Sequence, residues 1–255
     1  MSPDPAAAPV FLIGGGWDPA AGRELYGAVL AACDTARPQV ACVVLDEGDG
    51  TEQFARWAGA LSAAAPCVPV PVLVPEGGEL DVTGLGDADA VLVCGGLTPA
   101  YAAALAPARQ PLQAWLAERH RPYAGFSAGA AVAASRAVVG GWLAGEVPVC
   151  PEDAAEDLEQ VSVVDGLGLV PFSVDVHCAQ WGTLPRLLSA LTNLPGGTGV
   201  GLDENTLLTV VGHTATVSGR GHAWLVTPAT DGAQVRALRH GEEFTAPTGD
   251  APLVA

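Results

Sequence analysis

A single serine stands in the middle of the segment Gly125, Phe126, Ser127, Ala128 and Gly129, with a glycine two residues away on each side. Glycine and alanine at these positions permit a sharp turn between a strand and a helix, because a larger side chain would strike the neighbouring backbone. Such a turn lifts the serine oxygen above a sheet and directs the free N–H groups of the first helical turn at a bound group. The pattern indicates that Ser127 is a nucleophile that attacks a carbonyl carbon; a serine that only caps a helix is the alternative.

A serine nucleophile needs a base that takes its proton and an acceptor that orients the base. Histidine commonly serves as the base, and the sequence contains five histidines. Four of them lie in charged or polar segments, which favours exposed positions: His120, His213, His222 and His240. His177 instead ends a short predicted strand in a mostly apolar setting. His177 is therefore the candidate base, and a buried histidine with a purely structural role is the alternative.

Short apolar runs alternate with helical patterns in the part of the chain that precedes Ser127. Strands are predicted over 10–13, 40–45, 68–74 and 88–94, with another just before Ser127; helices are predicted over 20–36 and 52–65, with an interrupted helix ending near 119. This alternation predicts a three-layer α/β fold, in which a mostly parallel sheet has helices on both faces. The prolines of the run over 68–74 favour an edge position in that sheet.

Glycines or carboxylates follow several of these strands, at residues 14–16, 46–47 and 95–96. Because ligands bind at the carboxyl ends of parallel strands, these segments and Ser127 are expected on one rim of the sheet. An irregular acidic loop is expected over 146–159, followed by a strand over 174–177 and a helix over 181–191. Strands over 199–202 and 206–211, and short β runs separated by residues 219–221, then predict a C-terminal antiparallel hairpin at the edge of the sheet.

Composition limits the class of protein. The net charge of −17 argues against nucleic acid as a partner, because phosphate binding needs clustered lysine and arginine. No apolar run is long enough to cross a bilayer, and residues 1–9 lack the basic segment of a secretion signal, so we expect no membrane partner and a cytoplasmic location. The six cysteines are scattered without a CxxC pair, which favours reduced thiols over disulfides or a metal site. We expect a flexible tail over 1–9 and a single catalytic domain over 10–255.

Five segments, taken in order, resemble the serine peptidase family that includes dipeptidase E and cyanophycinase: residues 11–16 (FLIGGG), 93–96 (VCGG), 125–130 (GFSAGA), 175–177 with 186–187 (DVH and RL), and 199–206 (GVGLDENT). The resemblance implies a class I glutamine amidotransferase-like fold, in which serine stands where the amidotransferases use cysteine. It implies that Ser127 is the nucleophile, that His177 is the base, and that the backbone N–H groups of Gly96 and Ala128 form the oxyanion hole. The expected activity is hydrolysis of small peptides or amides through an acyl-enzyme, in the manner of an exopeptidase or dipeptidase and without a cofactor. The sequence allows a homodimer and does not specify the oligomeric state.

The carboxylate that orients His177 is taken from the same resemblance. In the cyanophycinase branch, a Gly-Gly pair after the nucleophile is followed closely by Gly-Glu; here residues 140–141 are followed by Gly145 and Glu146, with a spacer one residue longer. Glu146 is therefore the predicted third member of the triad. The alternatives that remain open are Glu152, Asp153 and Asp175. A structural role, such as holding the loop beneath the site, is expected for two further carboxylates, Asp203 and Glu204.

Two departures from the family concern substrate binding. After the Gly-Gly pair the family usually has polar residues, whereas this chain has Leu97 and Thr98. Just after the histidine the family tends to have arginines that bind a substrate carboxylate, whereas this chain has Trp181 there, and its next arginine is Arg186. These four residues are the predicted substrate-binding residues, and a strong preference for Asp-X dipeptides is not expected.

Two other functions compete with a serine hydrolase. The altered residues 97–98 favour an amidotransferase-like domain that has lost catalysis and only binds a small molecule or a partner. An esterase of the α/β-hydrolase type would carry its histidine in a late C-terminal loop, after the acid, and His177 comes too early for that order. A full set of serine, histidine and glutamate, with Glu146 as the predicted glutamate, favours the hydrolase.

Overall fold

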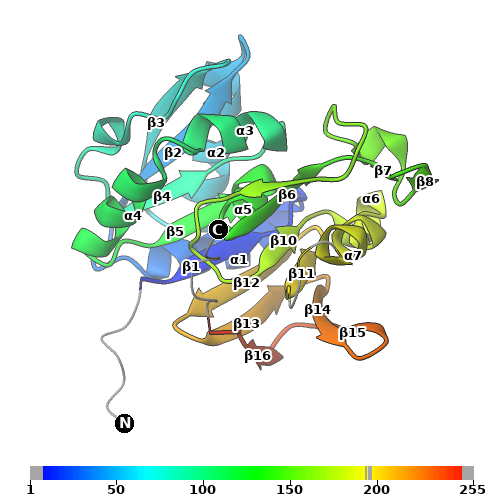
Figure 1. Ribbon diagram of the computed structural model, residues 1–255. Helices are drawn as coiled ribbons and strands as arrows, with labels where there is room; N and C mark the ends of the chain where they lie inside the picture. Colours follow the sequence, from blue (N-terminus) through cyan, green and yellow to red (C-terminus); the bar gives the residue numbers. More distant parts are fainter. Residues whose placement is uncertain (1–7, 193, 195–196, 249–255) are drawn as a thin grey trace.

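An eight-stranded sheet with the order β16-β13-β12-β1-β5-β4-β2-β3 forms the centre of the computed structural model, which describes residues 8–192, 194 and 197–248 (Figure 1). Its strands are β1 (Val10–Ile13), β2 (Gln39–Asp46), β3 (Val68–Pro75), β4 (Ala90–Val93), β5 (Tyr123–Phe126), β12 (Thr206–Val211), β13 (Thr214–Gly219) and β16 (Glu243–Thr245). The strands β1, β5, β4, β2 and β3 are parallel, whereas β12, β13 and β16 pair antiparallel with their neighbours. The prolines of β3 predicted an edge position, and β3 is the last strand on its side.

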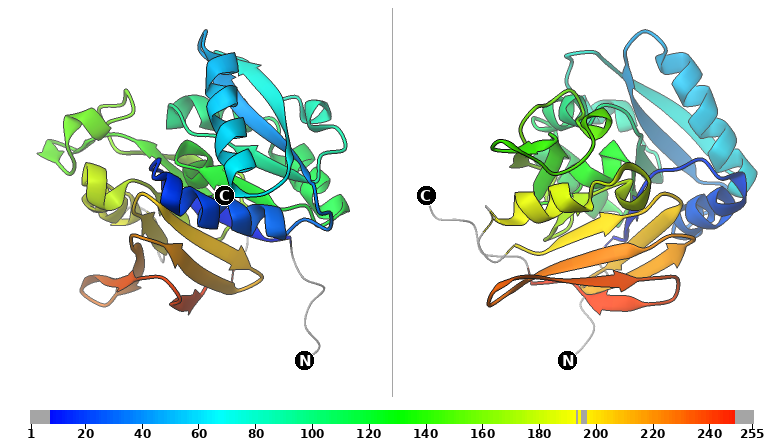
Figure 2. Two further views of the ribbon diagram at one scale, coloured as in Figure 1. Left: turned by 180° about the vertical axis from the view of Figure 1, so that it is seen from behind. Right: turned by 90° about the vertical axis from the view of Figure 1, so that its right-hand side faces the viewer.

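Helices cover both faces of this sheet. One face carries α1 (Pro19–Ala31) and α2 (Gly50–Ala64), and the other carries α3 (Thr98–Leu105), α4 (Arg109–Glu118) and α5 (Ala128–Val132) (Figures 1 and 2). The strands β1, β4 and β5 are buried along their whole length, because parallel strands between two helical layers have no solvated face. The predicted α/β fold with a mostly parallel sheet is thereby confirmed.

A second, four-stranded sheet has the order β10-β11-β14-β15. Its strands are β10 (Ser173–Asp175), β11 (Gly199–Leu202), β14 (Ala223–Ala229) and β15 (Gly232–Leu238). The strands β10 and β11 are parallel, with Asp175 paired to Gly201. Between them lie α6 (Cys178–Trp181) and α7 (Leu184–Thr192), so the single helix predicted over 181–191 is interrupted at Gly182, which has a φ of 69°.

The segment between Ser127 and β10 contains only short elements. β6 (Arg136–Gly140) pairs with β9 (Ser162–Asp165), and the hairpin of β7 (Leu143–Ala144) and β8 (Val147–Pro148) lies between them. The acidic loop expected over 146–159 contains β8 and the 3-10 helix η2 (Glu152–Ala154); a second one, η1 (Val82–Leu85), precedes β4. In Figure 1 this segment projects from the right-hand side of the molecule.

The C-terminal antiparallel strands are confirmed, but their turns differ from the prediction. Residues 219–221 do not form a hairpin turn; they connect β13 of the central sheet to β14 of the second sheet. The hairpins are instead β12–β13 and β14–β15. A glycine-rich turn signal marks a change of direction but does not specify which strand comes next in the sheet.

Several sequence-based expectations concern features outside the two sheets. Of the tail expected over 1–9, residues 1–7 lie outside the described residues, as do 249–255 of the expected domain. No helix in the described part of the chain is long and apolar enough to cross a membrane. The cysteines are free thiols in the structure, and four of them are buried: Cys42, Cys67, Cys94 and Cys178.

Candidate active site

Ser127 lies in the turn between β5 and α5. Its backbone has a φ of 51° and a ψ of −110°, a conformation that residues with a side chain rarely adopt. Its N–H donates to the carbonyl oxygen of Ile13 at 2.8 Å, which ties the turn to β1. A Cβ atom at Gly125 would lie 2.3 Å from the carbonyl oxygen of Gly129, and one at Gly129 would lie 2.1 Å from that of Val93. The turn therefore requires glycine at both positions, as the sequence pattern indicated.

His177 follows β10, and its imidazole reaches Ser127. The Nε2 atom lies 2.8 Å from the Oγ atom of Ser127. The backbone of His177 is left-handed, with a φ of 56°, and its N–H donates to the carbonyl oxygen of Gly14 at 3.0 Å. The ring of Trp181 stacks on the imidazole with a centroid separation of 3.8 Å and an interplanar angle of 7°. A Cβ atom at Gly15 would lie 2.1 Å from Cε1 of His177, so this glycine leaves room for the ring.

The carboxylate beside His177 belongs to Glu204, which follows β11. Its Oε1 atom lies 2.8 Å from Nδ1 of His177. Because the register of β10 and β11 pairs Asp175 with Gly201, the residues just beyond the two strands come together. A proton on Nδ1 that is donated to Glu204 leaves Nε2 free to accept the proton of Ser127. Ser127, His177 and Glu204 thus form one continuous hydrogen-bonded relay.

Glu146 does not reach His177, and the predicted triad is corrected in favour of Glu204. Glu146 is exposed in the turn of the β7–β8 hairpin. Two hydrogen bonds of 3.1 Å between the backbone of Gly145 and the side chain of Gln160 hold this turn in place. The Gly-Glu pair therefore marks a hairpin turn in this chain, which directs the carboxylate to solvent.

Among the described residues, none of the three alternative carboxylates is hydrogen-bonded to His177. Asp175 accepts two hydrogen bonds from Arg186, at 2.9 and 2.7 Å, between side chains that are 1% and 3% exposed. Glu152 and Asp153 line the cavity described below, but among the described side chains His177 is hydrogen-bonded only to Ser127 and Glu204.

Asp203 has the structural role that was expected of it. Its carboxylate accepts the backbone N–H groups of Ala179 at 3.0 Å and His222 at 2.9 Å, and the indole N–H of Trp224 at 2.8 Å. These bonds tie the loop that carries Glu204 to α6 and to β14. For Glu204 only a structural role was expected, and this prediction missed the hydrogen bond between its carboxylate and the imidazole of His177.

The protonation of His177 follows from two opposed effects. Burial lowers the pKa of His177 below its usual value, whereas the hydrogen bond and the charge of Glu204 raise it. Burial is the larger effect, so the imidazole is neutral near pH 7. Neutral imidazole is the form that accepts a proton from a serine hydroxyl.

Two backbone donors lie next to Ser127. The N–H groups of Gly96 and Ala128 have no hydrogen-bond acceptor within the residues that the structure describes. Ala128 is the first residue of α5, where an N–H has no partner within the helix. A Cβ atom at Gly95 would lie 3.3 Å from Cβ of Ser127, so the loop that carries Gly96 passes close beside the serine.

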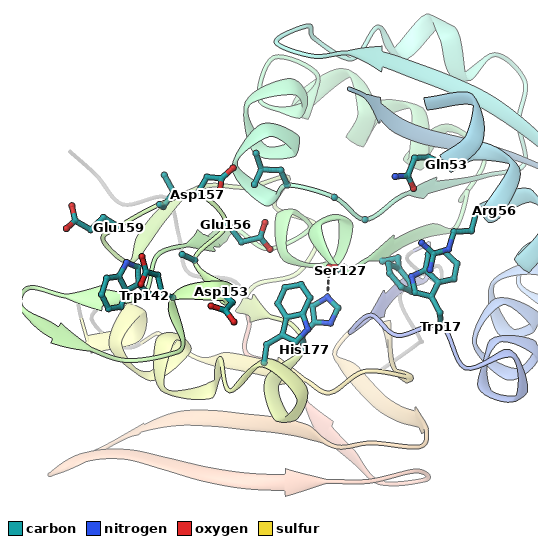
Figure 3. Close-up of a pocket in the computed structure, with 18 of the residues that line it drawn as sticks. Trp17, Gln53, Arg56, Ser127, Trp142, Asp153, Glu156, Asp157, Glu159 and His177 are labelled. Atoms are coloured by element: carbon teal, nitrogen blue, oxygen red, sulfur yellow. Dashed lines mark hydrogen bonds between the residues drawn. The ribbon is translucent and has the colours of Figure 1, made fainter. Parts of the chain in front are cut away.

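Ser127 and His177 open into a cavity of about 850 Å³ (Figure 3). On one side Trp17 packs against Trp57 and Phe126, with ring centroids 4.4 and 5.1 Å apart. The guanidinium carbon of Arg56 lies 3.5 Å from the centroid of the Trp17 ring. In Figure 3 the opposite side carries four carboxylates, those of Asp153, Glu156, Asp157 and Glu159, and Glu152 also lines the cavity. The catalytic candidates therefore lie between an aromatic side with one arginine and an acidic side.

Two of the four predicted substrate-binding residues line this cavity, namely Leu97 and Trp181. Thr98 and Arg186 do not, and their prediction is corrected. The backbone N–H of Thr98 donates to Oε2 of Glu156 at 2.9 Å, at the start of α3. Arg186 is buried and donates to Asp175 and to the carbonyl oxygen of Ala154, which joins η2 to β10.

Sequence reasoning missed Trp17, Arg56 and Glu156. Trp17 directly follows the glycines at the end of β1, and residues after the carboxyl end of a parallel strand commonly face a ligand. The position of Trp17 in the sequence could therefore have identified it as a residue that faces the ligand. Arg56 lies on α2 and Glu156 in an acidic loop, where a charged residue is ordinarily just solvated, so no local signal distinguished them.

Comparison with known proteins gives three kinds of match. A model of peptidase family S51 matches residues 75–218. A cyanophycinase from Geminocystis herdmanii is 40% identical over 83 residues, which make up 32% of this chain and 27% of that protein. The matched stretch thus spans about a quarter of the length of this curated relative.

Solved structures with the same fold include two peptidases. A peptidase from an acI-B1 actinobacterium is 19% identical, with a TM-score of 0.63 over 94% of this chain and 97% of that one. A putative peptidase E protein from Listeria monocytogenes EGD-e is 15% identical, with a TM-score of 0.56 over 84% of this chain and 98% of that one. At these identities the likeness shows a shared fold.

Proposed function

The chain belongs to peptidase family S51 and is a serine-type peptidase, and from this premise we propose that it cleaves short peptides through an acyl-enzyme formed on Ser127. The relay of two 2.8 Å contacts, from Ser127 through His177 to Glu204, is the observation that carries this proposal. Nothing about this relay favours a domain that has lost catalysis.

The proposed reaction has two stages. Oγ of Ser127 attacks the carbonyl carbon of the scissile bond while Nε2 of His177 takes the hydroxyl proton. The tetrahedral intermediate collapses as His177 gives that proton to the nitrogen of the leaving amine, which departs and leaves an ester on Ser127. A water molecule then attacks the ester carbonyl carbon while His177 accepts a proton from it; His177 passes this proton to Oγ of Ser127 as the ester bond breaks, and the acid product is released.

Glu204 acts through His177 in this scheme. Its carboxylate holds the Nδ1 proton and thereby fixes the tautomer and the ring orientation. It also stabilises the imidazolium that forms when His177 takes the proton of Ser127. The stacked ring of Trp181 limits rotation of the imidazole, which supports the same orientation.

The backbone N–H groups of Gly96 and Ala128 are proposed as the oxyanion hole. Both lack an acceptor among the residues described, and both lie next to Ser127. Donors that are fixed before the reaction stabilise the negative charge that develops on the carbonyl oxygen, and the loss of one such donor typically costs about 100- to 1000-fold in rate.

Small peptides suit the size of the site. A cavity of about 850 Å³ is within the range of sites that enclose drug-sized ligands. Its aromatic side, with Trp17 and Phe126 in contact, offers apolar surface to a side chain next to the scissile bond.

The proposed function is tested with single and double variants of the pair, Ser127→Ala and His177→Ala, assayed on a library of short peptides. We expect each single variant to lose nearly all hydrolysis, and the double variant to be no slower than Ser127→Ala, because residues that act as one unit are not additive. Retention of more than a few per cent of activity by Ser127→Ala would contradict the assignment, and so would a double variant much slower than either single one.

A further inference from the structure

Arg56 is held in the cavity by its contact with an aromatic ring. It lies on α2, and its guanidinium group lies over Trp17, a geometry in which the cation is attracted to the face of the indole. Trp17 in turn contacts Phe126, the residue before Ser127, with ring centroids 5.1 Å apart. The guanidinium group is thus connected to the nucleophile through two packed rings.

The charge of Arg56 is not paired with a carboxylate among the residues that the structure describes. Among the ion pairs that the described residues form, none includes Arg56. It is also the only lysine or arginine among the described residues that line the cavity. A guanidinium group presents its N–H donors in a planar fork that matches a carboxylate, so an unpaired one that faces a reaction site is suited to an anionic group of the ligand.

The other side of the cavity is unsuited to an anion. In Figure 3, Asp153, Glu156, Asp157 and Glu159 lie on the opposite side of Ser127 and His177 from Arg56. A second negative group would be repelled there, whereas an ammonium group would be attracted. A free peptide carries an ammonium group at one end and a carboxylate at the other, and these match the two sides of the cavity.

We infer that Arg56 binds the C-terminal carboxylate of a short peptide substrate. This inference rests on the proposed function, since it names the substrate end that the same site recognises. The peptide then crosses Ser127 with its amino end toward the acidic side. The cation comes from α2, an element distant in sequence from the segment after His177, where the family tends to have arginines.

The test pairs a change in the enzyme with a change in the substrate. Peptides of two or three residues with uncharged side chains are prepared as the free acid and as the C-terminal amide. Both forms are assayed with the wild type, with Arg56→Gln and with Arg119→Gln. Arg119 is the matched control, because it is an exposed arginine that pairs with Asp87 and does not line the cavity.

In the wild type and in Arg119→Gln we expect kcat/KM for the free acid to exceed that for the amide by about 10-fold, the size expected of one charge-assisted hydrogen-bonded contact. In Arg56→Gln this ratio is expected to fall to about one, through a higher KM for the free acid with little change in kcat, because the carboxylate is distant from the reacting bond. Activity on the amide, which offers no carboxylate to Arg56, is expected to change far less than activity on the free acid, and this remaining activity also shows that the variant folds.

Three results overturn the inference. In one, the ratio of acid to amide is the same in Arg56→Gln as in the wild type. In another, Arg56→Gln removes a preference for Asp over Asn within the peptide but leaves the ratio of kcat/KM for acid and amide unchanged. Arg56 would then bind a side-chain carboxylate of the substrate. In the last, the wild type cleaves no peptide and Ser127 resists serine-directed probes, and the proposed function then fails together with the inference. The first two leave the proposed function intact.

Discussion

Ser127 and His177 both have a positive φ, 51° and 56°, although only His177 is in the left-handed helical conformation. Such a conformation costs a residue with a side chain about 1–3 kcal/mol, and it persists where the surroundings fix it. Here the N–H groups of the two residues donate to the carbonyl oxygens of Ile13 and Gly14, at 2.8 and 3.0 Å. The end of β1 therefore holds both residues of the pair in the strained conformations that bring their side chains together.

At the residue scale, exchange of Glu204 for glutamine tests which carboxylate orients His177. We expect Glu204→Gln to lower kcat/KM by about 100-fold or more, because loss of the orienting acid leaves the imidazole free to adopt the wrong tautomer. Glu146→Gln is the matched control, and its activity is expected to equal that of the wild type because Glu146 lies exposed in a hairpin turn. If Glu146→Gln lowered kcat/KM strongly and Glu204→Gln did not, Glu146 would be the third member of the triad.

The pH profile reports on the same imidazole. Because burial lowers the pKa of His177, the acidic limb of kcat/KM is expected below the ordinary histidine value of about 6.5, with activity lost as the pH falls through that limb. Glu204 raises this pKa, so its removal in Glu204→Gln is expected to move the limb to still lower pH. The limb of this variant is measured on its residual activity. A shift of the limb to higher pH would show that Glu204 does not stabilise the protonated imidazole of His177.

At the element scale, the junction of β5 and α5 depends on very close approach of backbone atoms. Gly129 faces the carbonyl oxygen of Val93 on the neighbouring strand β4, and a Cβ atom there would lie 2.1 Å from it. The helix cannot shift away without displacing Ser127, since the two are adjacent in the chain. Packing of α5 against β4 thus fixes the height of the nucleophile above the sheet.

Gly129→Ala is therefore expected to destabilise the protein by about 1–3 kcal/mol, the usual cost of overpacking, and to reduce activity as well. The matched control is Gly27→Ala in α1, where a Cβ atom would meet nothing within 4 Å. This control is expected to stabilise the protein by about 0.4–1 kcal/mol, because alanine restricts the unfolded chain. Chemical unfolding of the two variants measures both free energies, and equal effects would show that the junction tolerates a side chain.

At the scale of the whole molecule, the sequence predicted the layers and the nucleophile well because both depend on local patterns. Alternating apolar runs predicted the mostly parallel sheet, and the two glycines around Ser127 predicted its turn. The position of Glu204 depends instead on the register of β10 and β11, strands separated by α6 and α7, and no local pattern encodes such a pairing. No local pattern encodes, either, that β12, β13 and β16 extend the central sheet on the side of β1, with β12 next to β1.

The distribution of charge is also a property of the whole molecule. The net charge of −17 argues against nucleic acid as a partner, but it does not show where the carboxylates gather. Four of them lie on one side of the described cavity, and its one arginine lies on the other (Figure 3). This separation arises because α2 and the segment around η2 reach the same rim from opposite sides of Ser127 (Figure 3).

Covalent labelling with a phosphonofluoridate probe, followed by peptide mass mapping, tests whether Ser127 is a nucleophile activated by His177 and Glu204. We expect one adduct per chain, located on Ser127, absent from Ser127→Ala, and formed far more slowly in His177→Ala and Glu204→Gln. An adduct on another residue, or labelling of Ser127 at the same rate in wild type and His177→Ala, would contradict the account.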